Sequence, residues 1–198
     1  MDAVDCLIPA AGRSSRMGTW KLMLPFGGKS VIETVVSTAL NVCARVVLVT
    51  GYRSDDLTSF FDGSDCVTTI ENTDWRNGMF STVRAGIEAV KTRRFFITLA
   101  DMPLVDSDVY RVILRASKIA PENQSDDVFL PIFNGRRGHP VLLPNGIIPK
   151  IRNAGPEITT MKQIIRRERI REVAWKNDTI HRDLDTLAEY KSALHRPE

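Results

Sequence analysis

The stretch Pro9-Ala10-Ala11-Gly12-Arg13-Ser14-Ser15-Arg16-Met17-Gly18-Thr19-Trp20-Lys21 directly follows a short apolar run that begins at Val4. Its small residues let the backbone approach a ligand closely, and successive amides in such a loop can surround phosphate oxygens. Arg16 and Lys21 supply the positive charge that a triphosphate requires. Because open α/β sheets bind ligands beyond the carboxyl ends of their strands, this order predicts a phosphate-binding loop in an α/β fold.

Two familiar phosphate-binding patterns are absent from this loop. The Walker pattern needs Gly-Lys-Ser/Thr after four intervening residues, and the dinucleotide fingerprint needs Gly-x-Gly-x-x-Gly. Residues 9–21 match neither pattern, which disfavours a P-loop ATPase and a Rossmann dehydrogenase. Taken alone, the segment would also suit an ordinary loop that carries two solvated basic residues.

Short apolar runs alternate with amphipathic stretches along the rest of the chain, which is the pattern of β-α-β units and a mostly parallel sheet. Strands are predicted at residues 4–9, 45–50, 66–71, 95–100, 129–133, 140–143 and 171–175. Helices are predicted at residues 30–42, 54–61, 79–90, 108–120, 158–167 and 187–194, the fourth with Ser107 as its N-cap. The turn-rich residues 134–138 predict antiparallel additions to the sheet.

The composition is that of an ordinary globular chain. Its 198 residues are 43% hydrophobic and 26% charged, and 27 Lys and Arg against 24 Asp and Glu give a net charge of +3. This length predicts one domain over residues 1–198. The small charge gives no ground for a nucleic-acid partner, and no apolar run approaches the roughly 20 residues that span a bilayer.

The cysteine count bears on location. Cys6, Cys43 and Cys66 are odd in number and widely spaced, which fits neither a disulfide framework nor a zinc site. Reduced thiols are the simplest interpretation. Without a basic leader segment or a membrane span, the sequence predicts a cytoplasmic protein with no membrane partner.

Carboxylates stand at two further places where a nucleotide site needs them. The predicted strand 95–100 runs directly into Asp101, at the sheet edge where ligands bind. Asp183 and Asp185 precede the last predicted helix, where a carboxylate serves as a helix cap about as readily as a metal ligand. Hard carboxylate oxygens suit Mg²⁺, which keeps several waters and bridges substrate phosphates. Together with the loop, these acids predict a nucleotide bound as its magnesium complex.

In this combination the sequence resembles the small nucleotidyltransferases that activate cofactors and sugars, and among them the molybdenum cofactor cytidylyltransferase group. The resemblance runs from Cys6 to Tyr190. It is carried, in order, by Pro9-Ala10-Ala11-Gly12, Ser15-Arg16-Met17-Gly18, Lys21, Asn72 followed by Gly78-Met79-x-x-Thr82, Asp101-Met102-Pro103, Gly138-His139-Pro140 and Asp183-x-Asp185-Thr186. It implies a Rossmann-like three-layer α/β sandwich of the nucleotidyltransferase type. The implied reaction joins CMP from CTP, with Mg²⁺ as cofactor, to the phosphate of the molybdopterin cofactor and releases diphosphate.

The resemblance also assigns residues. Arg16, Lys21 and Asp101 would be catalytic, with Asp101 and Asp185 as the metal ligands. The nucleotide would be bound by Pro9, Ala10, Ala11, Gly12, Ser14, Ser15, Arg16, Lys21, Asn72, Ser81 and Thr82, and the acceptor by Gly138, His139 and Pro140. Because a phosphate monoester is already an anionic nucleophile, no general base is expected. His139 is expected to position the acceptor or to brace its loop.

The first motif bears on the choice of base. Related guanylyltransferases usually carry Leu-Ala-Gly-Gly where this chain has Pro9-Ala10-Ala11-Gly12, the form typical of cytidylyltransferases. Ala11 in place of glycine removes room and flexibility in a loop that lies near the base. The resemblance therefore favours CTP.

One departure from the group concerns the acceptor. Members commonly carry Gly-Asp-x-Gly-Ala-Arg where this chain has Gly155-Pro156-Glu157-Ile158-Thr159-Thr160. This departure is similar to the branch of molybdenum-hydroxylase accessory proteins, which implies a molybdenum hydroxylase as partner. Two alternatives stay open: transfer to a sugar or polyol phosphate, and a non-catalytic accessory protein that binds nucleotide or cofactor.

A basic cluster follows this departure. It consists of Lys162, Arg166, Arg167, Arg169 and Arg171. A solvated helix face is the ordinary explanation of such a charge run. An acceptor phosphate or an acidic partner enzyme is the alternative.

Overall fold

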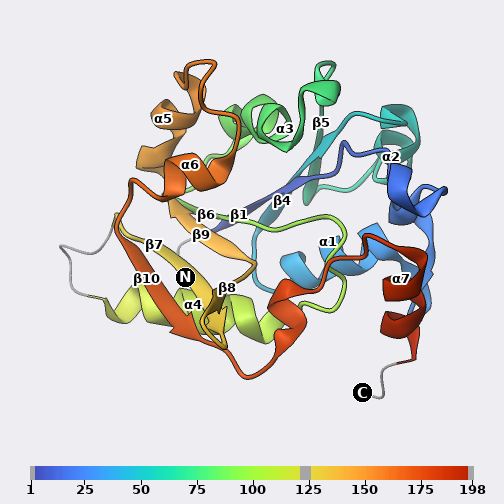
Figure 1. Ribbon diagram of the computed structural model, residues 1–198. Helices are drawn as coiled ribbons and strands as arrows, with labels where there is room; N and C mark the ends of the chain where they lie inside the picture. The colour runs from blue at the N-terminus through green and yellow to red at the C-terminus, as the bar shows by residue number, and fades with distance from the viewer. Residues whose placement is uncertain (1–2, 121–125, 196–198) are drawn as a thin grey trace.

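The strand that precedes the phosphate-binding loop, β1 (Asp5–Pro9), lies inside the main sheet of the computed structural model, which describes residues 3–120 and 126–195 (Figure 1). The other strands of this sheet are β4 (Arg45–Thr50), β5 (Val67–Glu71), β6 (Arg94–Ile97), β7 (Val128–Phe133), β8 (Arg136–Arg137), β9 (Val141–Pro144) and β10 (Ile170–Ala174). They run in the order β10-β7-β9-β6-β1-β4-β5, with β8 paired to β7. A separate hairpin joins β2 (Pro25–Phe26) to β3 (Lys29–Ser30).

The sheet is mostly parallel, as the alternation of apolar runs and amphipathic stretches predicts. β1 pairs in parallel with β4 and with β6, so that Cys6 lies opposite both Val46 and Phe96. β9 is antiparallel to β6 and to β7, and β8 is antiparallel to β7. These are the antiparallel additions that the turn-rich residues 134–138 predict.

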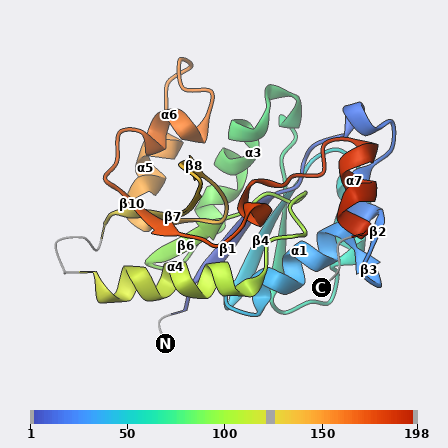
Figure 2. The same ribbon diagram turned by 60° about the horizontal axis from the view of Figure 1, so that its bottom comes forward.

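Helices cover both faces of the sheet. They are α1 (Val31–Leu40), α2 (Ser54–Phe60), α3 (Met79–Gly86), α4 (Ser107–Ile119), α5 (Ile148–Arg152), α6 (Met161–Ile165) and α7 (Leu187–Leu194). Figures 1 and 2 show α1 and α4 on one face and α3, α5 and α6 on the other. The predicted three-layer α/β sandwich is therefore confirmed.

The alternation of side chains along β1 fills the two cores. Cys6 and Ile8 pack in the cluster that contains residues of α1 and α4, and Leu7 packs in the cluster that contains residues of α3 and α5. All five residues of β1 are buried, as expected for a parallel strand covered on both faces. Each fully buried Leu or Ile contributes roughly 1.5–3 kcal/mol, so these cores hold β1 firmly under the loop that follows it.

The strand order creates a switch point beside β1. From β1 the chain adds β4 and then β5 on one side, and it then crosses to add β6 on the other side. The carboxyl ends of β1 and β6 therefore begin loops that diverge and leave a crevice between them, which is where open α/β sheets bind their ligands. The loop of residues 9–21 and Asp101 follow these two strands.

Several helices differ in their bounds from the sequence prediction, and the clearest physical causes are at α4 and α6. The N-cap of α4 is Asp106 rather than Ser107, because its carboxylate accepts hydrogen bonds from Asp108 N (2.8 Å) and Val109 N (3.3 Å). The helix predicted at residues 158–167 is shortened to α6, because the Gln163 side chain accepts from Thr160 N (2.9 Å) and so fixes the helix start. Residues 148–152, which no prediction covered, form α5.

The shortened helix also divides the basic cluster. Lys162 lies on α6, whereas Arg169 and Arg171 lie beyond it. Both of these arginines pair with the fully buried carboxylate of Asp127, at 3.0 and 2.8 Å. The expectation of one solvated helix face is therefore wrong for these two residues, which neutralise a buried charge between β7 and β10.

Two predictions made from the composition, on the cysteines and on membrane spans, can be compared with the structure. Cys6 and Cys43 are buried, Cys66 is exposed, and all three are free thiols, as predicted. Among the described residues, none of the helices has the length and apolar content needed to cross a lipid bilayer.

Candidate active site

The loop after β1 is attached to the end of β4 by backbone hydrogen bonds. Ala10 N donates to a β4 carbonyl (2.8 Å), and Tyr52 N donates to Ala11 O (3.1 Å). Gly51 allows this close approach, because a Cβ there would lie 2.6 Å from the Cβ atoms of both Ala11 and Trp75. Ala10 and Ala11 are buried, so the first half of the loop is fixed against the sheet.

The second half of the loop folds into two single 3₁₀ turns, Ser15–Met17 and Lys21–Met23. Ser14 has a left-handed backbone (φ 56°), and its hydroxyl accepts a hydrogen bond from Lys21 N (3.2 Å). This bond closes the loop on itself. The basic side chains of Arg16 and Lys21 are thereby brought to the carboxyl edge of the sheet.

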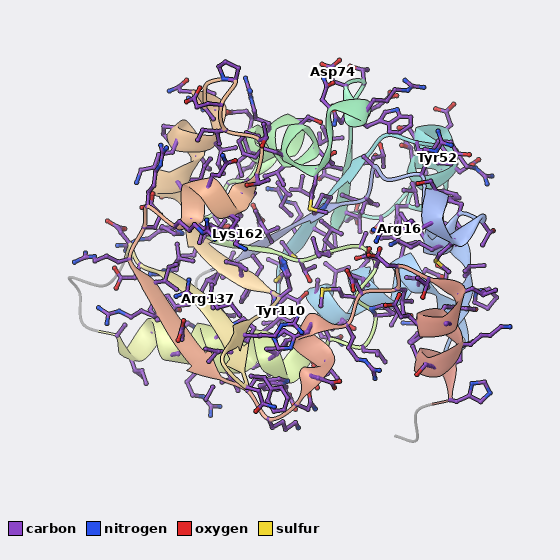
Figure 3. All side chains as sticks on the ribbon, in the orientation of Figure 1. Arg16, Tyr52, Asp74, Tyr110, Arg137 and Lys162 are labelled. Carbon is purple, nitrogen blue, oxygen red and sulfur yellow. The ribbon has the colours of Figure 1, made fainter. Side chains whose placement is uncertain are left out.

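Arg16, Lys21, Asp101 and Asp185 form one cluster of ion pairs, which we call the ion-pair cluster. Lys21 Nζ donates to Asp101 Oδ2 (2.6 Å) and to Asp185 Oδ1 (3.0 Å). Arg16 Nη1 lies 2.8 Å from the other oxygen of Asp185. The Lys21 side chain is only 12% exposed, whereas that of Arg16 is 72% exposed and extends toward solvent (Figure 3). The structure therefore brings together four residues to which the resemblance assigned separate roles in catalysis and metal binding.

The pKa values in the cluster follow from burial and from these charges. Burial acts to lower the pKa of Lys21, but Asp101 and Asp185 outweigh it, and the pKa is raised. Burial acts to raise the pKa of Asp185, but Lys21 and Arg16 hold it below its ordinary value. Among the residues that the structure describes, no cation forms an ion pair with Asp183. Burial, followed by repulsion from Asp185, raises its pKa.

The ion-pair cluster lies in a cleft of about 330 Å³ at the switch point. Its lining is Pro9, Ala10, Gly12, Arg13, Ser14, Ser15, Arg16, Lys21, Leu22, Met79, Leu99, Ala100, Asp101, Asp183 and Asp185. Most of the residues predicted to bind the nucleotide therefore share one cavity with both predicted metal ligands. Ala11 does not line the cleft. Its side chain lies on the other side of the loop, beside Gly51.

Asn72, Ser81 and Thr82 form a hydrogen-bonded group beside the cleft. Asn72 Nδ2 donates to Ser81 Oγ (3.0 Å) and to Thr82 Oγ1 (3.1 Å). Asn72 and Ser81 line a second cavity, of about 620 Å³, between α3 and residues 155–159. Met79 stands next to this group in sequence, lines the first cleft and is 57% exposed.

Gly138, His139 and Pro140 do not line the cleft. A Cβ on Gly138 would lie 2.3 Å from Ile180 O, and His139 N donates to the same oxygen (3.0 Å). Burial lowers the pKa of the His139 ring, which is therefore neutral near pH 7. These contacts brace residues 138–140 against the segment that leads to Asp183, which corresponds to the second of the two roles expected for His139.

Several cleft residues are not among those singled out from the sequence. Met79 lies inside one of the motifs that carry the resemblance, and Leu99 and Ala100 immediately precede Asp101. The sequence could therefore have identified these three residues as part of the site. Tyr52 lies outside the lining of the cleft, and no sequence motif pointed to it. Its ring makes edge-to-face contacts with Trp20 and Trp75 (centroids 6.3 and 5.8 Å apart), which join the loops that carry these two residues.

Two carboxylates converge on one point in this site, since Asp101 and Asp185 both contact Lys21 Nζ. Over the part of the chain that the structure describes, no group of three or more His, Cys, Asp or Glu side chains is arranged to hold a metal ion. Any divalent ion at this point would therefore take its remaining ligands from water or substrate. This is the usual arrangement for Mg²⁺ bound with a nucleotide.

The fold and the cleft together define a nucleotidyltransferase. A loop of small and basic residues after β1 faces carboxylates after β6 and before α7, at the switch point of the sheet. The family model described as "MobA-like NTP transferase domain" matches residues 6–173. The chain belongs to this family.

Individual relatives agree with this assignment. The chain is 35% identical to the molybdenum cofactor cytidylyltransferase of Escherichia coli (strain K12) over 196 residues, covering 99% of this chain and 98% of that one. It is 26% identical to a probable molybdenum cofactor guanylyltransferase of Natranaerobius thermophilus over 68% of this chain and 62% of that one. The fold is similar to the crystal structure of Rv0371c from Mycobacterium tuberculosis H37Rv (TM-score 0.81, 18% identity, 98% and 100% of the two chains).

Proposed function

We propose that the protein transfers CMP from CTP to the phosphate of the molybdopterin cofactor and releases diphosphate. The ion-pair cluster carries this proposal, because it gathers two cations and two carboxylates in one cleft beside a phosphate-binding loop. The relative with 35% identity over nearly the full length has this named activity. The motif Pro9-Ala10-Ala11-Gly12 supports the same choice.

The proposed reaction requires little covalent chemistry from the side chains of the protein. The acceptor phosphate is the nucleophile, and its oxygen must be held in line with the α-phosphorus of CTP. Arg16 and Lys21 neutralise the triphosphate and the negative charge that develops on the departing diphosphate. Loop amides between Gly12 and Arg16 bind phosphate oxygens and fix their position. No side chain needs to remove a proton from the acceptor.

Asp101 and Asp185 are the proposed ligands of a divalent cation, with Mg²⁺ as the physiological choice. They suit a hard cation because both are carboxylates and both reach the same small positive group, Lys21 Nζ. When bound, Mg²⁺ supplies electrostatic stabilisation of the triphosphate oxygens. Asp183, whose pKa is raised, lines the same cleft and is proposed to hold water around the cation rather than to bind it directly.

The preference for CTP is proposed to arise in the loop after β1. The Cβ of Ala11 lies beside Gly51, behind the loop, so its methyl group restricts the backbone of the loop that would lie near the base. In the presence of Mg²⁺ we expect CTP to raise the melting temperature more than GTP does. Ala11→Gly should reduce that difference, and it should lower the melting temperature without nucleotide only slightly, because glycine in place of alanine costs roughly 0.5–1 kcal/mol. Equal shifts with CTP and GTP in the unsubstituted protein would contradict the base assignment.

The acceptor is the least constrained part of the proposal. Residues 155–160 depart from the group's motif, and four of them, Gly155, Pro156, Ile158 and Thr159, line the second cavity beside α3. A molybdenum hydroxylase partner and a cytosolic location stay predictions. The deciding experiment measures diphosphate release with each triphosphate, alone and with molybdopterin cofactor or a sugar or polyol phosphate. Release that requires CTP and the molybdopterin cofactor is expected; release only with a sugar or polyol phosphate would replace this acceptor, and no release with any pair would favour a binding protein.

A further inference from the structure

The Lys21 ammonium lies where the proposed metal ligands converge. Its Nζ is 2.6 Å from Asp101 Oδ2 and 3.0 Å from Asp185 Oδ1, and its side chain is 12% exposed. The main chain of Lys21 is also fixed, because its N donates to Ser14 Oγ. Lys21 is therefore a well-held cation between two carboxylates, rather than a mobile surface charge.

Arg16 adds to this neutralisation from the solvent side. It contacts Asp185 Oδ2 at 2.8 Å, while Lys21 contacts the other oxygen of the same carboxylate. Both oxygens of Asp185 therefore have cationic partners. A divalent ion that approached alone would have to displace a held ammonium and would meet two positive side chains.

The metal-ligand set is also incomplete without substrate. Within residues 3–120 and 126–195, no three His, Cys, Asp or Glu side chains are grouped to hold a metal. Mg²⁺ in nucleotide enzymes commonly takes one or two carboxylates, and substrate phosphates and water complete its shell. A triphosphate would supply oxygen ligands for the metal and an anionic partner for Arg16 and Lys21.

We propose that Lys21 is the resident counter-ion of the metal site, and that metal and nucleotide consequently bind in an interdependent way. The triphosphate draws Lys21 and Arg16 away from Asp101 and Asp185, which then accept the metal. Because such coupling is reciprocal, the metal must also raise the affinity for the nucleotide. The inference rests on the proposed function only in assigning these carboxylates to the metal.

The test measures binding of Mn²⁺, without nucleotide, by the loss of the free-ion signal in electron paramagnetic resonance. The unsubstituted protein should bind Mn²⁺ weakly. Lys21→Met removes the ammonium but keeps an unbranched apolar side chain, and it should bind Mn²⁺ at least ten-fold more tightly. Lys29→Met is the matched control, because Lys29 is exposed and its ammonium group donates only to Ser37 Oγ among the contacts described. It should behave like the unsubstituted protein.

Thermal denaturation gives a second readout. Removing Lys21 leaves two carboxylates close together without their shared cation, so Lys21→Met should melt at a lower temperature. Mn²⁺ alone should restore much of that loss in the variant and should shift the unsubstituted protein little. Adding Asp101→Asn to Lys21→Met should abolish the restoration. If Lys21→Met does not fold, Lys21→Gln provides the same comparison.

Two results would overturn the proposal. One is tight binding of Mn²⁺ by the unsubstituted protein in the absence of nucleotide. The other is a folded Lys21 variant that binds Mn²⁺ no more tightly than the Lys29→Met control. Since no acceptor and no turnover are involved, failure of CMP transfer would leave these measurements valid, and the two proposals can fail separately.

Discussion

Asp101 is the residue on which the proposed chemistry depends most directly. It follows β6 at the crevice between β6 and β1, and its carboxylate bonds Lys21 across 80 positions of sequence. Asp101→Asn keeps the size of the side chain and removes its charge. We expect kcat to fall by about 10²-fold or more, the scale of losing one electrostatic contact to a transition state. Steady-state diphosphate release measures this.

The control for that substitution is Asp108→Asn. Asp108 is an exposed carboxylate that pairs with Arg111 on α4, away from the cleft. It should keep nearly full activity. An active Asp101→Asn enzyme with an unchanged melting temperature would refute the metal-ligand assignment.

The ion-pair cluster also predicts how stability depends on pH. The pKa of Asp185 is lowered, so its contribution is present above the ordinary carboxyl pKa and is lost as pH falls through the folded-state value. The pKa of Lys21 is raised, so its contribution is present below the ordinary lysine value and is lost as pH rises through the folded-state value. The stability difference between the unsubstituted protein and Lys21→Met should therefore be flat from about pH 5 to 9.

Urea denaturation at a series of pH values measures that difference. It should shrink below about pH 4, where Asp185, whose pKa is lowered in the folded chain, becomes protonated first in the unfolded chain and then in the folded chain. A difference that changes steadily between pH 6 and 8 would show that another group controls the cluster.

At the scale of elements, the start of α7 positions Asp185. Thr186 is the N-cap, and Glu189 accepts hydrogen bonds from both Asp185 N (3.1 Å) and Thr186 N (2.7 Å). Thr186→Ala should cost about 1 kcal/mol of stability, which is typical of a lost N-cap. It should also raise the KM for CTP several-fold, because the backbone beside Asp185 is loosened.

Ser30→Ala is the matched control for that element. Ser30 caps α1 in the same kind of capping box with Glu33, away from the cleft. It should cost a similar amount of stability and leave the KM for CTP unchanged. If both variants raise KM equally, the effect comes from general destabilisation rather than from Asp185.

The elements that were predictable from sequence are the long and regular ones. The apolar runs of β1 and β4 and the repeat of apolar residues along α1 follow from local periodicity. The short helix α5 was not predicted, and α6 was predicted with bounds that are too wide, because its start depends on the Gln163 side chain. The insertion of β9 between β6 and β7 is a long-range pairing that no local pattern specifies.

At the scale of the whole molecule, the site is assembled from three distant segments. The residues of the ion-pair cluster were found from the order of their motifs, because each motif alone had an ordinary explanation. Their mutual contacts could not be found in that way. The net charge of +3 conceals them, since cations and carboxylates that meet in the cleft nearly cancel in the count. The contact between Ala11 and Gly51 could not be found from the sequence either, because it depends on the position of β4.

The central claim is that this cleft joins CMP to the phosphate of the molybdopterin cofactor. The most direct test incubates the protein with Mg²⁺, the cofactor and CTP that carries radioactive phosphorus at the α position, and follows the label by chromatography. The account predicts that label appears in a cofactor–cytidine dinucleotide, that label at the γ position appears only in diphosphate, and that Asp101→Asn forms both products about 10²-fold more slowly or not at all. Label that stays in CTP, or that appears only as free CMP with or without the cofactor, would contradict it.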